Sequence, residues 1–77
     1  MKELLFFIIE NITGIKDFEI EEVQDEGRLS LTVKAPKEAM GIIIGKGGNT
    51  IKTIRNILRV RATLDKIAVS VEVAEKV

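Results

Sequence analysis

Three stretches in which apolar and polar residues alternate decide most of what this chain can fold into. The clearest is residues 29–35, where Leu29, Leu31, Val33 and Ala35 alternate with polar side chains. A period of two is typical of a strand with one buried face. The turn-forming residues 25–27 connect it to a strand from Phe18 to about residue 24, so we expect an antiparallel hairpin. Residues 67–73 alternate in the same way and predict a third strand.

The segment before the first strand has the period of a helix. We expect this helix over residues 2–12, with Gly14 placed to end it. Its apolar residues recur at three- and four-residue spacing and are Leu4, Leu5, Ile8 and Ile12.

Two more helices are predicted between the second and third strands. Pro36 closes the strand and suits the first turn of a short helix over about 37–43. The next helix begins near Asn49 or Thr50. Its apolar side holds Ile51, Ile54, Ile57, Leu58 and Ala62. Arg61 falls on that side too, so either the helix ends near Val60 or the arginine stem lies along the core with its head in water.

The resulting order is α-β-β-α-α-β in a chain of 77 residues, which is room for one domain spanning 1–77. A strand–helix–helix–strand crossover normally joins parallel neighbours in a right-handed sense. We therefore predict an α+β fold with a three-stranded mixed sheet, covered on one face by helices.

The composition argues against several classes of function. The chain contains neither Cys nor His, so disulfides, the usual zinc ligands and the commonest general base are all missing. We expect no enzyme, no cofactor, no metal site and no small-molecule substrate. The apolar run over residues 4–9 is too short to cross a bilayer, so we expect a cytoplasmic protein that makes no membrane contact.

The charges balance overall but are unevenly distributed. Residues 1–40 carry five basic and nine acidic side chains, whereas residues 41–66 carry six basic side chains against Asp65 alone. A basic segment on an acidic body is typical of an anion-binding face.

The basic segment contains the loop Gly45-Lys46-Gly47-Gly48. Glycines permit positive φ and let another molecule's backbone approach closely, and N–H groups at a following helix start favour phosphate. Downstream, Lys52, Arg55 and Arg59 extend the positive potential along that helix. The spacing of these glycines fits neither a nucleotide-hydrolase phosphate loop nor a dinucleotide fingerprint. The remaining alternative is a glycine-rich turn between packed helices that binds nothing.

The run from Ile43 to Ile54 resembles the KH signature: two aliphatics, Gly, two variable residues, Gly, and then spaced Ile residues. Together with the element order, the chain resembles type II KH domains, and in particular the small stand-alone bacterial KH proteins of the KhpA type. The resemblance implies non-catalytic binding of single-stranded RNA, as in an RNA chaperone, through a GXXG loop that holds the backbone of about four nucleotides. It also implies an adjacent aliphatic groove for the bases, flanked by Ile43, Ile44 and Ile51. The residues it implicates are Ile43, Ile44, Gly45, Lys46, Gly47, Gly48, Asn49, Thr50, Ile51, Lys52, Arg55 and Arg59.

The same resemblance implies self-association, or pairing with a second KH-containing protein. Phe6, Ile42 and Val60 stand where relatives more often have polar or small residues, and Phe6 and Val60 point away from the expected core. Clustered exposed apolar side chains favour a protein interface. Two alternatives stay open: a protein–protein module that has little intrinsic nucleic-acid binding, and a preference for single-stranded DNA.

Overall fold

The computed structural model describes residues 1–76 and has the predicted element order. Its elements are helix α1 (Lys2–Thr13), strands β1 (Glu19–Asp25) and β2 (Arg28–Ala35), helix α2 (Lys37–Ile44), a 3-10 turn η1 (Lys46–Gly48), helix α3 (Asn49–Leu64) and strand β3 (Ala68–Glu75). Gly14 ends α1 in the left-handed conformation, and its N–H donates to the Glu10 carbonyl at 2.8 Å.

The sheet has β2 at its centre and the order β1-β2-β3. The hairpin partner β1 is antiparallel to β2, with Ile20 opposite Val33, and β3 is parallel to β2, with Val71 opposite Leu31. The predicted hairpin and the predicted parallel third strand are both confirmed. β3 therefore forms an outer edge of the sheet.

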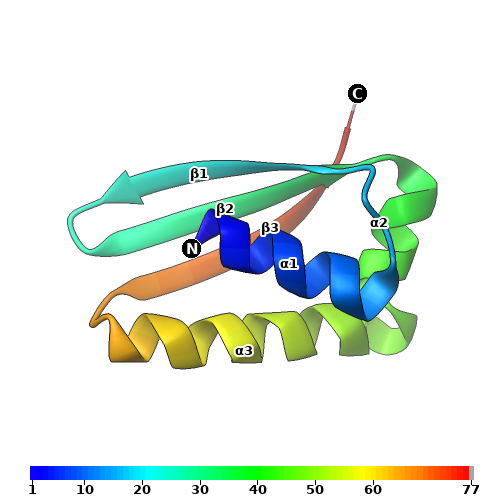
Figure 1. Ribbon diagram of the computed structural model, residues 1–77. Helices are drawn as coiled ribbons and strands as arrows, with labels where there is room; N and C mark the ends of the chain where they lie inside the picture. Colours follow the sequence, from blue (N-terminus) through cyan, green and yellow to red (C-terminus); the bar gives the residue numbers. More distant parts are fainter. Residues whose placement is uncertain (77) are drawn as a thin grey trace.

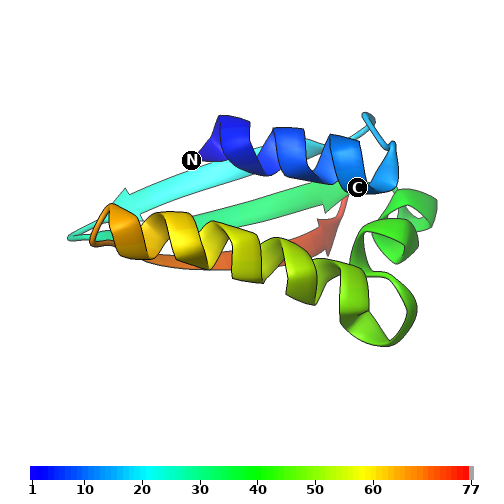
Figure 2. The same cartoon turned by 60° about the horizontal axis from the view of Figure 1, so that its bottom comes forward.

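The helices cover one face of this sheet, as predicted. In Figures 1 and 2, α1 and α3 cross that face side by side and α2 lies at one end of it, beside the glycine loop. The core between the layers contains every second residue of β2 together with buried aliphatics from all three helices. Its fully buried large side chains are Leu5, Ile9, Leu31, Val33, Ile43, Ile54 and Leu58.

Two residues predicted on apolar helix sides are exposed instead. Ile12 is 46% exposed because it lies in the last turn of α1. Ile57 is 42% exposed, since at 3.6 residues per turn it lies about 100° around α3 from the fully buried Leu58 and about 120° from the buried Ile51. Ile9, which the spacing argument left out, is fully buried.

Candidate nucleic-acid interface

The first glycine of the predicted loop is required by the fold itself. Gly45 has φ 79° and ψ 169°, a region that only glycine adopts without strain. A Cβ at this position would overlap the Thr50 side chain, lying 2.6 Å from its Cβ, and would be 2.9 Å from the Thr50 nitrogen. Gly45 thus lets the chain turn sharply from α2 toward α3 while packing against Thr50.

Gly47 and Gly48 differ from Gly45 in backbone conformation and in the space around them. Both are in the left-handed region, with φ 65° and 77°, and a Cβ at either one would meet no atom within 4 Å. The space beside these two glycines is therefore open, which is what close approach by another backbone requires.

Most of the N–H groups around the loop are already used. The predicted loop forms a turn of 3-10 helix, in which the Gly48 N–H donates to the Gly45 carbonyl at 3.0 Å and the Asn49 N–H donates to that of Lys46. The Gly45 N–H closes α2 on Gly41 at 2.9 Å. The Gly48 and Asn49 N–H groups are therefore not among the donors that the turn offers to a ligand. Within residues 1–76, only the Lys46 and Gly47 N–H groups of this turn lack a recorded acceptor.

The basic side chains beside the loop are mostly without anionic partners. Lys46, Lys52 and Arg59 are exposed and form no ion pair within the described part of the chain. Lys52, Arg55 and Arg59 recur every three or four residues on one side of α3, as predicted. We call these three residues the basic stripe. Its net effect is uncompensated positive charge along the first two-thirds of α3.

Arg55 differs from the other two members of the basic stripe. Its Nε donates to the Val71 carbonyl on β3 at 3.1 Å, across a separation of 16 residues. Arg55 and Arg59 line a hollow of about 280 Å³ between α3 and the edge of β3. The final strand therefore forms the far wall of a depression that begins beside the basic stripe.

Arg61 lies apart from the basic stripe. Helix α3 continues to Leu64, so the helix does not end near Val60. The Arg61 side chain is exposed, and its Nε forms an ion pair with Asp65 at 3.1 Å. The arginine head therefore lies in solvent.

The aliphatic residues expected to flank a groove need correction. Ile43 is 0% exposed and Ile51 is 7% exposed, so neither presents more than a trace of surface to a ligand. Their side chains belong to the core and support the loop from beneath. Ile44 and Thr50 are half-buried and Asn49 is exposed, so these three remain accessible beside the turn.

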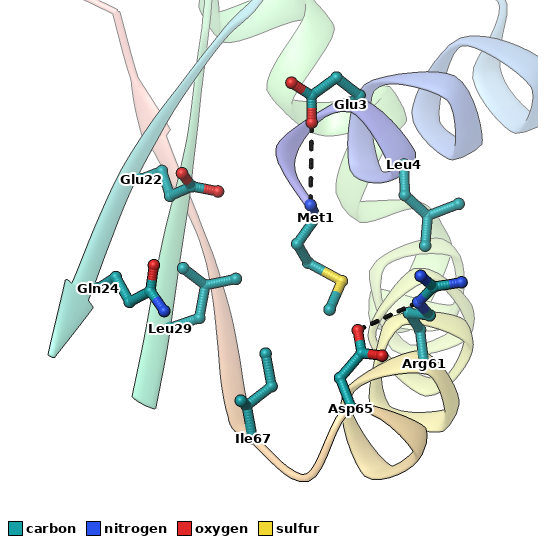
Figure 3. A pocket seen from close by; sticks show the side chains of 9 residues that line it. All are labelled: Met1, Glu3, Leu4, Glu22, Gln24, Leu29, Arg61, Asp65 and Ile67. Atoms are coloured by element: carbon teal, nitrogen blue, oxygen red, sulfur yellow. Dashed lines mark hydrogen bonds and ion pairs between the residues drawn. The ribbon is translucent and has the colours of Figure 1, made fainter. Parts of the chain in front are cut away.

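A larger cavity, of about 500 Å³ (Figure 3), lies at the end of α3, whereas the glycine loop precedes that helix. It is enclosed by the start of α1, the end of α3 and the sheet between them. Its charged lining includes Glu3, Glu22 and Asp65 against Arg61, and Arg61 is already paired with Asp65. An acidic cavity repels a polyanion, so this site does not fit nucleic acid.

The three residues predicted at a protein interface differ in how far they are exposed. Phe6 is 36% exposed and stacks on Phe18, with ring centroids 4.5 Å apart, so its ring packs at the border of the core. Ile42 and Val60 are exposed, as expected. The comparison with relatives, which suggested Phe6, Ile42 and Val60, missed the strongly exposed Phe7 and Leu64. Leu64 could have been found from its spacing to Val60 along α3.

Known proteins of one family resemble this chain over nearly its whole length. A family model described as KhpA/KhpB, KH domain, matches residues 2–73. The chain is 36% identical over 77 residues to the RNA-binding protein KhpA of Chlamydia trachomatis and 38% identical to that of Chlamydia pneumoniae, covering 99% of both chains in each case. It is 34% identical over 74 residues to the RNA-binding protein KhpA of Clostridium acetobutylicum, covering 95% of this chain and 99% of the relative. No solved structure matches the chain at a significant level.

Proposed function

Since the chain belongs to the KhpA/KhpB KH-domain family, we propose that it binds single-stranded RNA and catalyses no reaction on it. The relatives are named RNA-binding proteins. The observation that carries the proposal is the turn at Lys46 and Gly47. Two N–H groups without a recorded acceptor in residues 1–76 lie there beside open space and unpaired cations.

The proposed mechanism separates backbone binding from base contact. Phosphate oxygens accept hydrogen bonds from the Lys46 and Gly47 N–H groups, while Lys46, Lys52 and Arg59 supply positive charge. The chain has no aromatic residue after Phe18, so bases are held by hydrogen bonds and aliphatic packing rather than by stacking on rings. With few contacts, we expect dissociation constants on the order of micromolar or weaker.

The double variant Lys46→Asp/Gly47→Asp tests this proposal. It places two carboxylates where phosphate should bind, and aspartate tolerates the left-handed backbone at position 47. We expect RNA binding to disappear in fluorescence anisotropy titrations while circular dichroism stays unchanged.

A matched control keeps the chemistry and moves it to the far end of the molecule. Gly27 lies in the β1–β2 turn with φ 79° and open space around it, and Lys66 follows α3. Figure 1 shows that turn at the opposite end of the sheet from the glycine loop. The variant Gly27→Asp/Lys66→Asp should bind RNA far better than the first variant. Equal binding by the two variants contradicts the proposed clamp.

The same turn can accept the backbone of single-stranded DNA. Paired titrations with RNA and DNA oligonucleotides of matched sequence measure the preference between them. We expect tighter binding of RNA. Tighter binding of DNA contradicts that part of the proposal.

We further propose that two copies of the chain associate through the outer side of α3. Ile57, Val60 and Leu64 are all exposed there, Leu64 by 74%. Together with Thr53 they repeat at spacings of four, three and four residues, the pattern of a helix-to-helix seam. We call these four residues the α3 seam. About 100° of α3 separates Val60 from Arg59, so dimerisation leaves the basic stripe accessible.

Val60→Asp tests the seam, and Val23→Asp is its control. Val23 is 63% exposed and Val60 is 65% exposed, but Val23 lies on β1, on the face of the sheet opposite the helices. We expect Val60→Asp to be monomeric by sedimentation velocity while still binding RNA, and Val23→Asp to match the parent chain. A parent chain that is monomeric at high concentration contradicts the homodimer and favours a second KH-containing protein as the partner.

The exposed α3 seam also supports a second candidate function, a protein–protein module with little intrinsic RNA binding. The two candidate functions can be distinguished with the unmodified protein alone. RNA titration of labelled protein should shift the NMR signals of residues 43–55 under our proposal. Shifts absent from that range, with self-association intact, favour the module.

A further inference from the structure

The contact between Arg55 and β3 occurs at the open edge of the sheet. The Ala68 N–H donates to the Gly27 carbonyl at 2.9 Å, and the Lys76 N–H donates to that of Ala35 at 2.8 Å. Main-chain groups of successive strand residues point in opposite directions. Those of even-numbered residues in β3 therefore face β2, and the Val71 carbonyl that receives Arg55 points outward from the sheet.

The hydrogen bond between Arg55 and the Val71 carbonyl leaves part of the guanidinium free. Arginine has five N–H donors in a planar, rigid arrangement. With Nε–H committed to Val71, the four N–H groups on the two terminal nitrogens remain. They include two parallel donors at the end of the side chain. The hydrogen bond to the Val71 carbonyl thus fixes one corner of the guanidinium plane, and the terminal nitrogens remain free to donate to a ligand in the hollow that Arg55 lines.

The lining of the hollow favours a base over a phosphate. Val69 from β3 is half-buried and contributes apolar surface to the hollow beside the two arginines. The flat face of a base packs favourably on such apolar surface, whereas a phosphate gains nothing from it. Arg55 is seven residues beyond Gly48, or about 10 Å along α3, so a strand clamped at the loop reaches it within the few nucleotides that such loops hold.

We propose that Arg55 is a specificity-determining residue that selects guanine in the bound strand. This inference rests on the RNA binding proposed above. Guanine presents two neighbouring acceptors, O6 and N7, that match a pair of parallel arginine N–H donors; adenine replaces O6 with a donor. In RNA, single-stranded bases are splayed out and read along these same edges. Arg59, one turn further along α3 and without a recorded contact to β3, adds charge but no base selection.

The experiment measures the affinity of uridine-rich octamers that carry one purine at successive positions. The purine is guanosine, inosine, adenosine or 7-deazaguanosine. At one position we expect guanosine and inosine, which both keep O6 and N7, to bind about 5- to 150-fold more tightly than adenosine. Loss of N7 in 7-deazaguanosine should remove much of that advantage.

Two arginine variants then test which side chain is responsible for the guanosine preference. Arg55→Lys keeps the charge but loses the planar donor pair and its anchor. We expect it to lose the guanosine preference, so that its affinities for the guanosine and adenosine octamers become equal. Arg59→Lys should keep that preference. Thermal melting checks that both variants fold, and since Val71 lies at an open edge, water can hydrogen-bond its carbonyl in Arg55→Lys.

The possible failures are distinguishable. If the parent binds octamers but does not discriminate guanosine from adenosine, or if Arg55→Lys retains the discrimination, Arg55 does not select guanine and RNA binding stands. If the parent binds none of the octamers, the proposed function fails and the inference fails with it.

Discussion

Replacing Gly45 with alanine should destabilise the protein at least twice as much as the same replacement at Gly47. The backbone at Gly45, with φ 79° and ψ 169°, costs a residue with a side chain about 1–3 kcal/mol. Overlap with Thr50, whose Cβ would lie 2.6 Å from the new atom, adds about 1–3 kcal/mol. The total, about 2–6 kcal/mol, is a large part of the roughly 4–12 kcal/mol expected for a chain of this length.

Gly47 is the control for Gly45 because its backbone also has a positive φ, but no atom lies close to where its Cβ would be. Its φ is 65° and a Cβ there meets nothing within 4 Å, so only the left-handed backbone penalty of about 1–2 kcal/mol applies. Alanine also restricts the unfolded chain at both positions, which offsets about 0.4–1 kcal/mol in each. The difference between the two variants therefore reports the contact with Thr50 and the rarer backbone region.

Urea denaturation followed by circular dichroism measures both variants and their combination with Thr50→Gly. In the Thr50→Gly background, Gly45→Ala should recover part of the overlap cost of about 1–3 kcal/mol, because the overlapping side chain is gone. Relief should be partial, since the backbone nitrogen of residue 50 remains 2.9 Å away. Equal destabilisation at positions 45 and 47, or no relief by Thr50→Gly, would refute this account of the turn.

Other contacts lead to further expectations. For RNA binding, log K measured by anisotropy should fall with log salt at a slope of about −1.4 to −2 if two or three phosphates are neutralised; a flat dependence contradicts a phosphate clamp. Phe6→Ala should lower the free energy of unfolding by about 1–2 kcal/mol, less than Phe18→Ala at about 3–5 kcal/mol, because Phe6 is partly exposed and its contribution rests on the stacked pair. Arg61→Ala should change stability by less than about 1 kcal/mol in thermal melts, since its ion pair with Asp65 is exposed; a larger loss would mean that its stem packs on the core.

The sequence alone predicted the elements and their arrangement because both follow from local periodicity and chain geometry. Alternation at residues 29–35 identified the central strand, and Gly14 marked the end of α1, as observed. The parallel placement of β3 followed from the length of the connection between the strands. The glycine turn was also evident, since three glycines around Lys46 in the only basic segment are a local feature.

Only the tertiary structure decided which groups remain available to a ligand. The family resemblance placed Ile43 beside the loop but could not show that it is fully buried, and helical periodicity could not show that Ile57 is exposed. It also could not distinguish Arg55 from Lys52 and Arg59, because the Val71 carbonyl that Arg55 contacts is 16 residues away. Burial and hydrogen bonding at these positions depend on which distant residues the fold brings together, and no local pattern contains that information.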